Sequence, residues 1–275
     1  MLEPSFSFSV ELPDCPAKVN VACSPFSLKQ LTSWTSWLRA EEIQRVSTYR
    51  RQLDKELFIA RRGLARENIS RILNIEPSSI QFSTESMGKL CWASDDLDHQ
   101  PSSPHPKLDF SISKTSWQVA NSDESLPCGL VAMAACESER VGVDIETLGA
   151  LPELEILAMQ NLHPLELKIW HQIPQRDRTL AYYQLWVVKE AFVKAIGLGL
   201  SQPPNSILSI QALTGRAEGT VAVVNDEMKT CSGRYWLISI GEMQRLAVVT
   251  LHNGARFVLL KNCYQARGRT KSTVG

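Results

Sequence analysis

Two carboxylates stand two residues apart in the segment 141–146, in which every second residue is apolar. Such alternation is typical of a β-strand, and residues two apart in a strand share a face. Asp144 and Glu146 are therefore expected on one face, about 6.6 Å apart. At an effective dielectric of about 20, ionised carboxylates at that distance repel by about 2.5 kcal/mol. A wet surface, arginine partners or a divalent cation would each relieve the repulsion, and Mg²⁺ prefers such oxygen ligands.

A second group lies on a predicted helix. Trp186, Glu190 and Lys194 follow one another at intervals of four residues and share a face. A glutamate four residues before a lysine is often only a surface ion pair. A tryptophan is uncommon on a fully solvated face, however, and Gly197 and Gly199 indicate backbone that approaches a neighbour closely. Another face of this helix is apolar and is predicted to be buried: Ala181, Leu185, Val188, Phe192 and Ile196.

Donors suited to phosphate occur at two places in the first half of the chain. Ser113, Lys114 and Thr115 offer hydroxyl and ammonium groups at the end of a predicted strand, and Lys89 follows Gly88 in a predicted turn. Each of these segments, taken alone, is more typical of a solvated turn. The chain has no Walker A loop, no dinucleotide-binding glycine motif and no Gly-x-Ser-x-Gly nucleophile motif, which argues against those enzyme classes.

The order of the predicted elements indicates two similar α+β halves. In each half a strand is followed by helices and then by further strands, which suggests a duplicated unit with a junction near residue 138. No repeat is evident in the residues themselves. The helices are expected at 28–39, 54–73, 152–160, 164–172 and 179–196. The strands are expected at 18–25, 80–82, 108–113, 117–120, 129–135, 141–146, 235–240 and 246–251, with a polar loop at 95–106, a polar hairpin tip at 121–127 and a further strand candidate at 257–260.

Composition bounds the class of protein. The 275 residues carry 29 Lys and Arg and 29 Asp and Glu, and a net charge of zero argues against a protein that coats nucleic acid. No apolar run approaches the ~18 residues of a membrane span, and no secretory signal is recognised at the N-terminus. The seven cysteines form no Cys-x-x-Cys pair, so free thiols in a reducing cytoplasm are expected rather than disulfides or a zinc site.

Four motifs in this order and spacing resemble the 4′-phosphopantetheinyl transferase superfamily, most closely its long, monomeric Sfp-type branch. The resemblance runs from about Leu38 to Leu251, and the last two motifs are highly specific. The motifs are Gly88-Lys89, then Phe110-Ser111-Ile112-Ser113, then Gly142-Val143-Asp144-Ile145-Glu146, and finally Trp186-x-x-Lys189-Glu190-Ala191-x-x-Lys194-Ala195-x-Gly197-x-Gly199-Leu200.

This resemblance implies a fold, a reaction and a set of site residues. The fold would be two pseudo-twofold α+β halves, each a small antiparallel sheet packed with helices, with the active site in the cleft between them. The halves would be residues 1–138 and 139–266, followed by a disordered basic tail at 267–275. The reaction would transfer the 4′-phosphopantetheine arm of coenzyme A to a serine of an acyl or peptidyl carrier domain and release adenosine 3′,5′-bisphosphate.

By the same resemblance, Asp144, Glu146 and Glu190 would hold Mg²⁺ against the pyrophosphate. Glu190 would act as the base, directly or through water, and Lys194 would contact the phosphate or assist the attacking serine. Lys89, Ser113 and Lys114 would bind the phosphates of coenzyme A. For its 3′-phosphate the choice among Arg45, Arg50, Arg51 and Arg61 stays open, and Arg45 and Arg50 are the two expected.

The chain departs from the family pattern at three positions, and two other readings follow. Lys114 stands where the family usually has histidine, Leu90 where it often has proline, and Leu57 where it tends to carry a basic residue. Lys114 alone favours a non-catalytic module that binds coenzyme A or a nucleotide. A metal-free interaction protein with a wet Asp144 and Glu146 face is the third reading. Fatty-acid, polyketide and nonribosomal-peptide carriers all stay open as partners, and a single chain that supplies both halves predicts a monomer.

Overall fold

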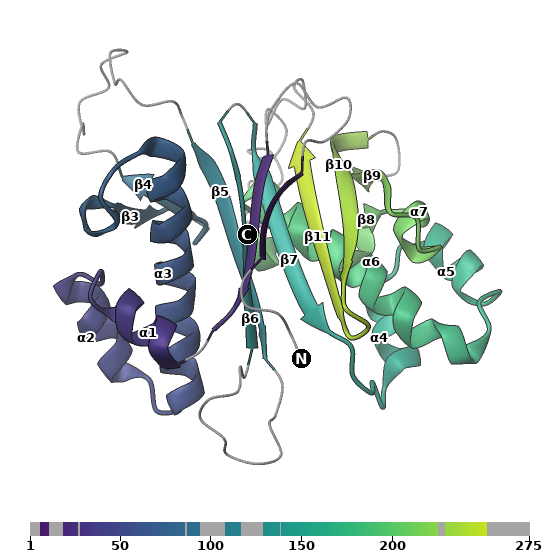
Figure 1. Cartoon of the computed structure of the whole chain (residues 1–275). Helices are drawn as coiled ribbons and strands as arrows, with labels where there is room; N and C mark the ends of the chain where they lie inside the picture. Colours follow the sequence, from purple (N-terminus) through teal and green to yellow (C-terminus); the bar gives the residue numbers. More distant parts are fainter. Residues whose placement is uncertain are drawn as a thin grey trace, which may run out of the picture.

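The computed structural model describes residues 6–10, 19–26, 28–85, 87–93, 108–116, 129–137, 139–224 and 229–251. Within these residues the fold is a mixed α+β structure with two antiparallel sheets that lie next to each other in the middle of the molecule (Figure 1). None of the described helices combines the length and apolar character that crossing a bilayer requires. The predicted loop at 95–106, the strand 117–120, the hairpin tip at 121–127, the strand 257–260 and the tail 267–275 lie outside the described residues.

The first sheet has the strand order β1-β2-β6-β5 and the second the order β7-β11-β10-β9-β8. The strands of the first sheet are β1 (Phe6–Val10), β2 (Val19–Pro25), β5 (Asp109–Ser116) and β6 (Gly129–Cys136). Those of the second are β7 (Val141–Thr147), β8 (Ile207–Leu208), β9 (Glu218–Val224), β10 (Lys229–Ile240) and β11 (Gln244–Leu251). A separate hairpin joins β3 (Gln81–Thr84) to β4 (Leu90–Ala93).

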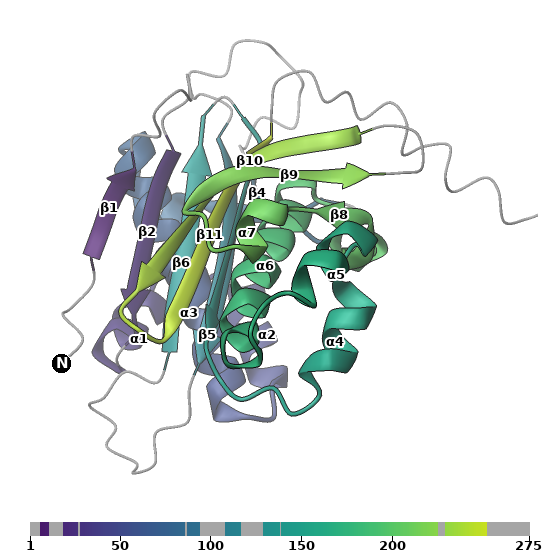
Figure 2. The ribbon, with the colours of Figure 1, turned by 90° about the vertical axis from the view of Figure 1, so that its right-hand side faces the viewer.

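Helices cover the outer face of each sheet. The first sheet carries α1 (Leu28–Thr35), α2 (Ala40–Thr48) and α3 (Gln52–Leu73). The second carries α4 (Leu154–Asn161), α5 (Pro164–Trp170), α6 (Gln175–Ile196) and α7 (Ile210–Leu213), which Figure 2 shows together on one side of it. Short 3₁₀ turns occupy Pro77–Ser79, Gly199–Ser201 and Pro204–Ser206.

The two sheets have corresponding topologies. In the first, β2 precedes the helices and pairs with β6, which pairs with β5. In the second, β7 precedes the helices and pairs with β11, which pairs with β10. The longest helix between these strands has 22 residues in both cases, α3 and α6.

Three apolar clusters make up the core, and the middle one joins the two sheets. Its side chains come from the inner faces of both sheets, for example Val21, Leu130, Val143 and Leu246. The other two clusters lie between each sheet and its own helices. The predicted alternation of β7 is confirmed, because Val141, Val143 and Ile145 all belong to the middle cluster.

The edge strands β5 and β7 contact each other through side chains of β5 and main-chain groups of β7. The N–H groups of Val141, Val143 and Thr147 donate to the side-chain oxygens of Asp109 (2.7 Å), Ser111 (3.1 Å) and Thr115 (3.0 Å), respectively. The separation is 32 residues each time, so the strands run parallel. An edge strand presents unpaired N–H groups, and burying one without a partner is unfavourable. Alternate side chains of β5 therefore take the place of a neighbouring strand's carbonyl groups.

The predicted helices are confirmed in kind and differ at their ends. The first, predicted to reach residue 39, ends at Thr35, and α2 begins after Arg39. The N–H of Arg39 donates to the Glu42 carboxylate at that start, at 3.1 Å. Helix α2 has only nine residues, and none of them is buried. The strands β1, β4, β8 and β9 and the helix α7 were also not predicted. Four cysteines lie in the described residues, and all four are free thiols, as expected: Cys23, Cys91, Cys136 and Cys231.

We predict that Gly142→Ala lowers the free energy of unfolding by about 3 kcal/mol, because overpacking of this kind displaces backbone. A Cβ atom at Gly142 would lie 1.8 Å from the carbonyl oxygen of Ala191 on α6. Gly149→Ala is the matched control, since its Cβ would meet only the Tyr183 hydroxyl at 3.7 Å. Urea denaturation measures both variants, and equal stabilities would contradict the close packing of β7 on α6.

We also predict that Ser111→Ala lowers stability by about 1–3 kcal/mol, because it leaves the buried N–H of Val143 without its acceptor. Ser116→Ala, an exposed position on the same strand, serves as control and should change stability by less than about 0.5 kcal/mol. The amide of Val143 should in addition exchange with solvent faster in Ser111→Ala. Unchanged exchange would show that the β5–β7 contact does not depend on this hydroxyl.

Candidate active site

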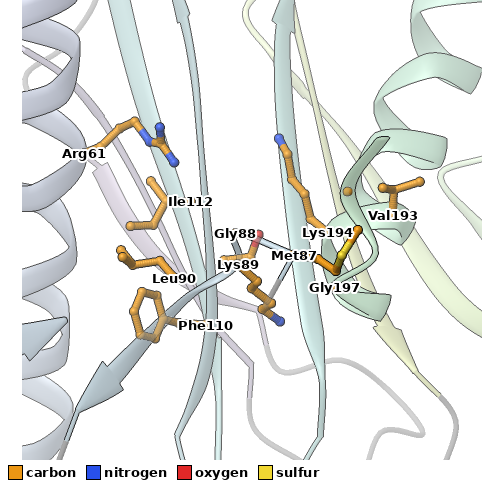
Figure 3. Close-up of a pocket in the computed structure, with 12 residues that line it drawn as sticks. Arg61, Met87, Gly88, Lys89, Leu90, Phe110, Ile112, Val193, Lys194 and Gly197 are labelled. Atoms are coloured by element: carbon orange, nitrogen blue, oxygen red, sulfur yellow. The ribbon is translucent and has the colours of Figure 1, made fainter. Parts of the chain in front are cut away.

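A cavity of about 180 Å³ lies between elements that pack with the first sheet and helix α6 of the second (Figure 3). Arg61 of α3 and Ile112 of β5 line one wall, and Val193 and Lys194 of α6 line the other. The turn between β3 and β4, with Gly88 at φ 90°, closes one side. That φ lies in the left-handed region, which glycine adopts without steric conflict. The cavity thus combines cationic and apolar walls.

Asp144 lies beside this cavity with its carboxylate buried. Asp144 as a whole is 3% exposed, and Lys194 Nζ donates a hydrogen bond to its Oδ1 at 2.5 Å. The Ser113 hydroxyl donates to the same oxygen at 2.7 Å and accepts from Lys194 at 3.0 Å. Ser113 comes from β5 of the first sheet, Asp144 from β7 of the second sheet and Lys194 from α6, so this triangle joins the two sheets. The second oxygen, Oδ2, is buried and has no hydrogen-bond partner among the described residues.

Glu146 and Glu190 lie in the electrostatic field of Asp144. Burial raises the pKa of Glu146 to about 7, and repulsion from Asp144 and Glu190 adds to the shift, while Lys194 and Lys114 oppose it. Burial also raises the pKa of Glu190, again with a contribution from Asp144 and opposition from Lys194. The two carboxyls are therefore poorly compensated and hold protons more readily than in water.

The carboxylates fit a hard divalent cation by donor type and by charge. Oxygen ligands are what Mg²⁺ prefers, and the unpaired Oδ2 of Asp144 is a buried acceptor. In the described geometry, however, no group of three His, Cys, Asp or Glu side chains comes close enough to hold one ion. The cation that forms an ion pair with Asp144 is instead the Lys194 ammonium, at 2.5 Å.

Lys114 lies on β5 next to Ser113 and keeps an exposed side chain. Partial desolvation and repulsion from Arg61 lower the pKa of its ammonium, and Lys194 contributes in the same direction. Asp54 and Glu146 oppose that shift. Lys114 therefore lies within electrostatic reach of Arg61 and Lys194, two cations that line the cavity, and such a group of cations suits a polyanionic ligand.

Lys89 lines the cavity but is strongly engaged with the protein. Its Nζ donates to Asp109 at 2.6 Å and to the carbonyl of Val141 at 2.9 Å, which leaves one of its three N–H donors. Nearby, Arg140 forms a two-point ion pair with Glu85 and donates to the Ala195 carbonyl. These contacts fasten the β3–β4 turn of the first half to the start of β7 and the end of α6.

Lys189, the buried lysine of the helical motif, has a structural environment. It is 2% exposed, and its Nζ donates to Glu166 at 2.6 Å and to the carbonyls of Asn161 and Pro204. Glu166 in turn accepts from the N–H groups of His163 and Ser209. All three donors of Lys189 are used, so it fixes α6 to the segments that carry these acceptors and thereby positions the adjacent Glu190.

Arg45 and Arg50 are not among the residues that line the cavity. Both are exposed, and the Arg45 guanidinium lies 5.6 Å from the centre of the Tyr49 ring. The arginine that lines the cavity is Arg61, which the sequence left as one of four alternatives. It follows Leu57 by one helical turn, and this spacing is the signal that could have selected it. The tryptophan of the motif, Trp186, stacks on Tyr182 at 6.0 Å.

Comparisons with known proteins agree on one family. The sequence model of the 4′-phosphopantetheinyl transferase superfamily matches residues 140–249, which span β7 to β11. The chain is 28% identical to the 4′-phosphopantetheinyl transferase Sfp of Bacillus subtilis over 182 residues, which cover 66% of the chain and 70% of Sfp.

Two further relatives are similar over somewhat shorter shares. The 4′-phosphopantetheinyl transferase HetI of Nostoc sp. is 25% identical over 63% of the chain and 65% of HetI. The 4′-phosphopantetheinyl transferase gsp of Aneurinibacillus migulanus is 31% identical over 52% of the chain and 49% of gsp. The chain thus spans about half to two thirds of the length of these two relatives.

A crystal structure of a holo-acyl-carrier-protein synthase of Thermotoga maritima aligns with 41% of the chain and 62% of its own length, at 18% identity and a TM-score of 0.28. That score is too low to support an argument. The family match covers the strand of Asp144 and Glu146 and the helix of Glu190 and Lys194, which are the elements that bring the charged groups together. On these grounds the part of the chain from β7 to β11 matches the 4′-phosphopantetheinyl transferase superfamily, and the chain as a whole is similar to members of that superfamily.

Proposed function

We propose that this protein transfers the 4′-phosphopantetheine arm of coenzyme A to a serine of a carrier protein. The observation that carries the proposal is the contact of Asp144 with Lys194 and Ser113 beside a cavity lined by cations of both halves. Transfer of a phosphoryl-type group depends mainly on alignment and on stabilisation of negative charge. The cavity can align the reacting groups, and its cations can stabilise the negative charge.

In the proposed reaction the serine Oγ of the carrier attacks the phosphorus that bears the pantetheine arm. A new P–O bond forms, the P–O bond to adenosine 3′,5′-bisphosphate breaks, and that product leaves with the bridging oxygen. The serine proton passes to Glu190, directly or through water. The raised pKa of Glu190 supports this role, because a carboxylate with a raised pKa is a stronger base than one in water.

Asp144, Glu146 and Glu190 are proposed to hold Mg²⁺. When bound, the ion would neutralise pyrophosphate charge and the mutual repulsion of the three carboxylates. The unpaired Oδ2 of Asp144 and the raised pKa of Glu146 support this set of ligands.

The remaining cations and the Ser113 hydroxyl are proposed to bind the phosphates of coenzyme A. Lys194, Ser113 and Lys114 would contact the pyrophosphate, and Lys89 would add its one unused donor. For the 3′-phosphate we favour Arg61 over Arg45 and Arg50, because Arg61 lines the cavity.

We further propose that the chain arose from an internal duplication and acts as a monomer in the cytoplasm. The corresponding topologies of the two sheets support a division into residues 1–138 and 139–266, since β6 ends at Cys136 and β7 begins at Val141. Both halves contribute to the cavity, so one chain supplies a whole site. The carrier would be an acyl or peptidyl carrier of fatty-acid, polyketide or nonribosomal-peptide synthesis.

A second candidate function is binding of coenzyme A or a nucleotide without transfer. Lys114, at the position where the family usually has histidine, favours it, because lysine meets phosphate as a flexible point charge. Calorimetry that gave tight coenzyme A binding in a protein without transfer activity would support this candidate.

We predict that the protein labels apo carrier proteins with a fluorescent coenzyme A in a Mg²⁺-dependent manner. Asp144→Asn and Glu190→Gln should each lower the rate by about a hundredfold or more, the scale expected when one group of a charge-stabilising site is removed. Glu242→Gln, an exposed acidic position of the same half, serves as control. The assay takes one fatty-acid, one polyketide and one nonribosomal-peptide carrier. A wild-type protein that labels none of them would overturn the proposed function.

We also predict that Glu146→Gln stabilises the metal-free protein at high pH. The wild-type pKa is raised from its usual 4.5 to about 7, so the folded state binds more protons than the unfolded state between these values. Wild-type stability should therefore fall as the pH rises from about 4.5 through about 7. At pH 8 with a chelator the variant should exceed it by roughly 1 kcal/mol. Thermal melts measure this, with Glu242→Gln as control, and the gain should vanish near pH 4.

A further inference from the structure

The ammonium of Lys194 occupies a cation position on Asp144. Three contacts form a closed triangle, with Lys194 Nζ and the Ser113 hydroxyl on the same carboxylate oxygen at 2.5 and 2.7 Å and on each other at 3.0 Å. A divalent ion on the buried Oδ2 would lie within a few ångströms of Nζ and would be repelled by it. Lys194 at this place and a metal on Asp144 therefore disfavour each other.

Of the two partners in this ion pair, Lys194 is the one that can move. The side chain of Asp144 is 4% exposed and stands on a strand packed tightly on α6, whereas the side chain of Lys194 is 31% exposed. Lys194 leaves the last turn of α6 on a long flexible stem and lines the cavity, across from Arg61 (Figure 3). An anion in the cavity could attract its Nζ away from Asp144 without any movement of the backbone.

Two further carboxylates near Lys194 favour its replacement by a divalent cation once an anion has entered the cavity. The positive charge of Lys194 compensates part of the negative charge of Glu146 and of Glu190. If Lys194 turned towards an anion, three carboxylates would lose compensation together, and a divalent cation would replace it. The positive charge of Lys114 also compensates Glu146, and its main electrostatic partners are Arg61, Asp54, Glu146 and Lys194.

We propose that Lys194 makes metal binding depend on coenzyme A: it fills the cation position on Asp144 in the free protein and leaves it when the pyrophosphate enters the cavity. The inference rests on the proposed function, because the anion is taken to be coenzyme A. Linkage then requires that the metal and coenzyme A each strengthen the binding of the other by the same factor. Lys194 is the coupling residue between them.

The test measures Mn²⁺ binding by electron paramagnetic resonance on the whole chain, with and without coenzyme A. In the wild type, coenzyme A should tighten Mn²⁺ binding by about tenfold or more, a typical size for coupling between two ligands. Lys194→Met should bind Mn²⁺ about tenfold more tightly than the wild type when coenzyme A is absent, and its gain on adding coenzyme A should shrink to about threefold or less. Lys194→Arg keeps the charge and should behave as the wild type does.

Lys114→Met is the matched control, because it removes a nearby positive charge whose main electrostatic partners are Arg61, Asp54, Glu146 and Lys194. An increase in Mn²⁺ affinity equal to that of Lys194→Met would show a general charge effect and would overturn the proposal. Equal Mn²⁺ affinities of Lys194→Met and the wild type without coenzyme A would overturn it too, as would the absence of Mn²⁺ binding in both.

Carrier labelling separates this proposal from the proposed function. A wild-type protein that labels carriers while Lys194→Met leaves the Mn²⁺ affinity unchanged would keep the function and reject the coupling. A wild-type protein that labels no carrier rejects the function, whatever its Mn²⁺ affinity.

Discussion

The buried carboxylate of Asp144 is the constraint on which the rest of the site depends. Asp144 is 3% exposed, and a carboxylate buried to this extent needs a cation or hydrogen-bond donors at short range, because an unpaired charge is strongly unfavourable away from water. One of its oxygens receives Lys194 and Ser113, and the other has no partner among the described residues. The position of the carboxylate follows from β7, whose apolar side chains face the core between the sheets while Asp144 faces α6. Gly142 allows this arrangement, since any side chain there would meet the backbone of α6.

The contact between β5 and β7 also serves to place a partner on Asp144. Because β5 and β7 are edge strands of different sheets, main-chain pairing within a sheet does not align them. The hydroxyls of Ser111 and Thr115 and the carboxylate of Asp109 align them instead, at a fixed separation of 32 residues. Ser113 lies between these contacts on β5, and this places its hydroxyl on Asp144. The ion pair of Arg140 with Glu85 adds a second link, from the β3–β4 turn to the end of α6.

The sequence predicted those parts of the fold that have a strong period, and missed those that do not. The alternation in 141–146 and the apolar stripe from Ala181 to Ile196 predicted the strand and the helix of the site, because each buries one face. Helix α2 was missed because nine residues give only a short periodic pattern, and β8 was missed because two residues show no period. The β5–β7 contact could not be predicted from the sequence either. Ser111 and Thr115 are common strand residues, and only the folded chain brings them to the main chain of β7.

Lys189 and Lys194 show why residue type alone could not assign roles on α6. They stand five residues apart, so they point about 140° apart around the helix. Lys189 is enclosed, and its three donors meet Glu166 and two carbonyls, which fixes it in one place. Lys194 keeps part of its side chain in water and lies between a carboxylate and a cavity. A lysine whose donors are all held can only position its neighbours, whereas a partly solvated lysine can exchange one anion for another. The direction in which each side chain leaves the helix therefore separates the positioning residue from the one suited to chemistry.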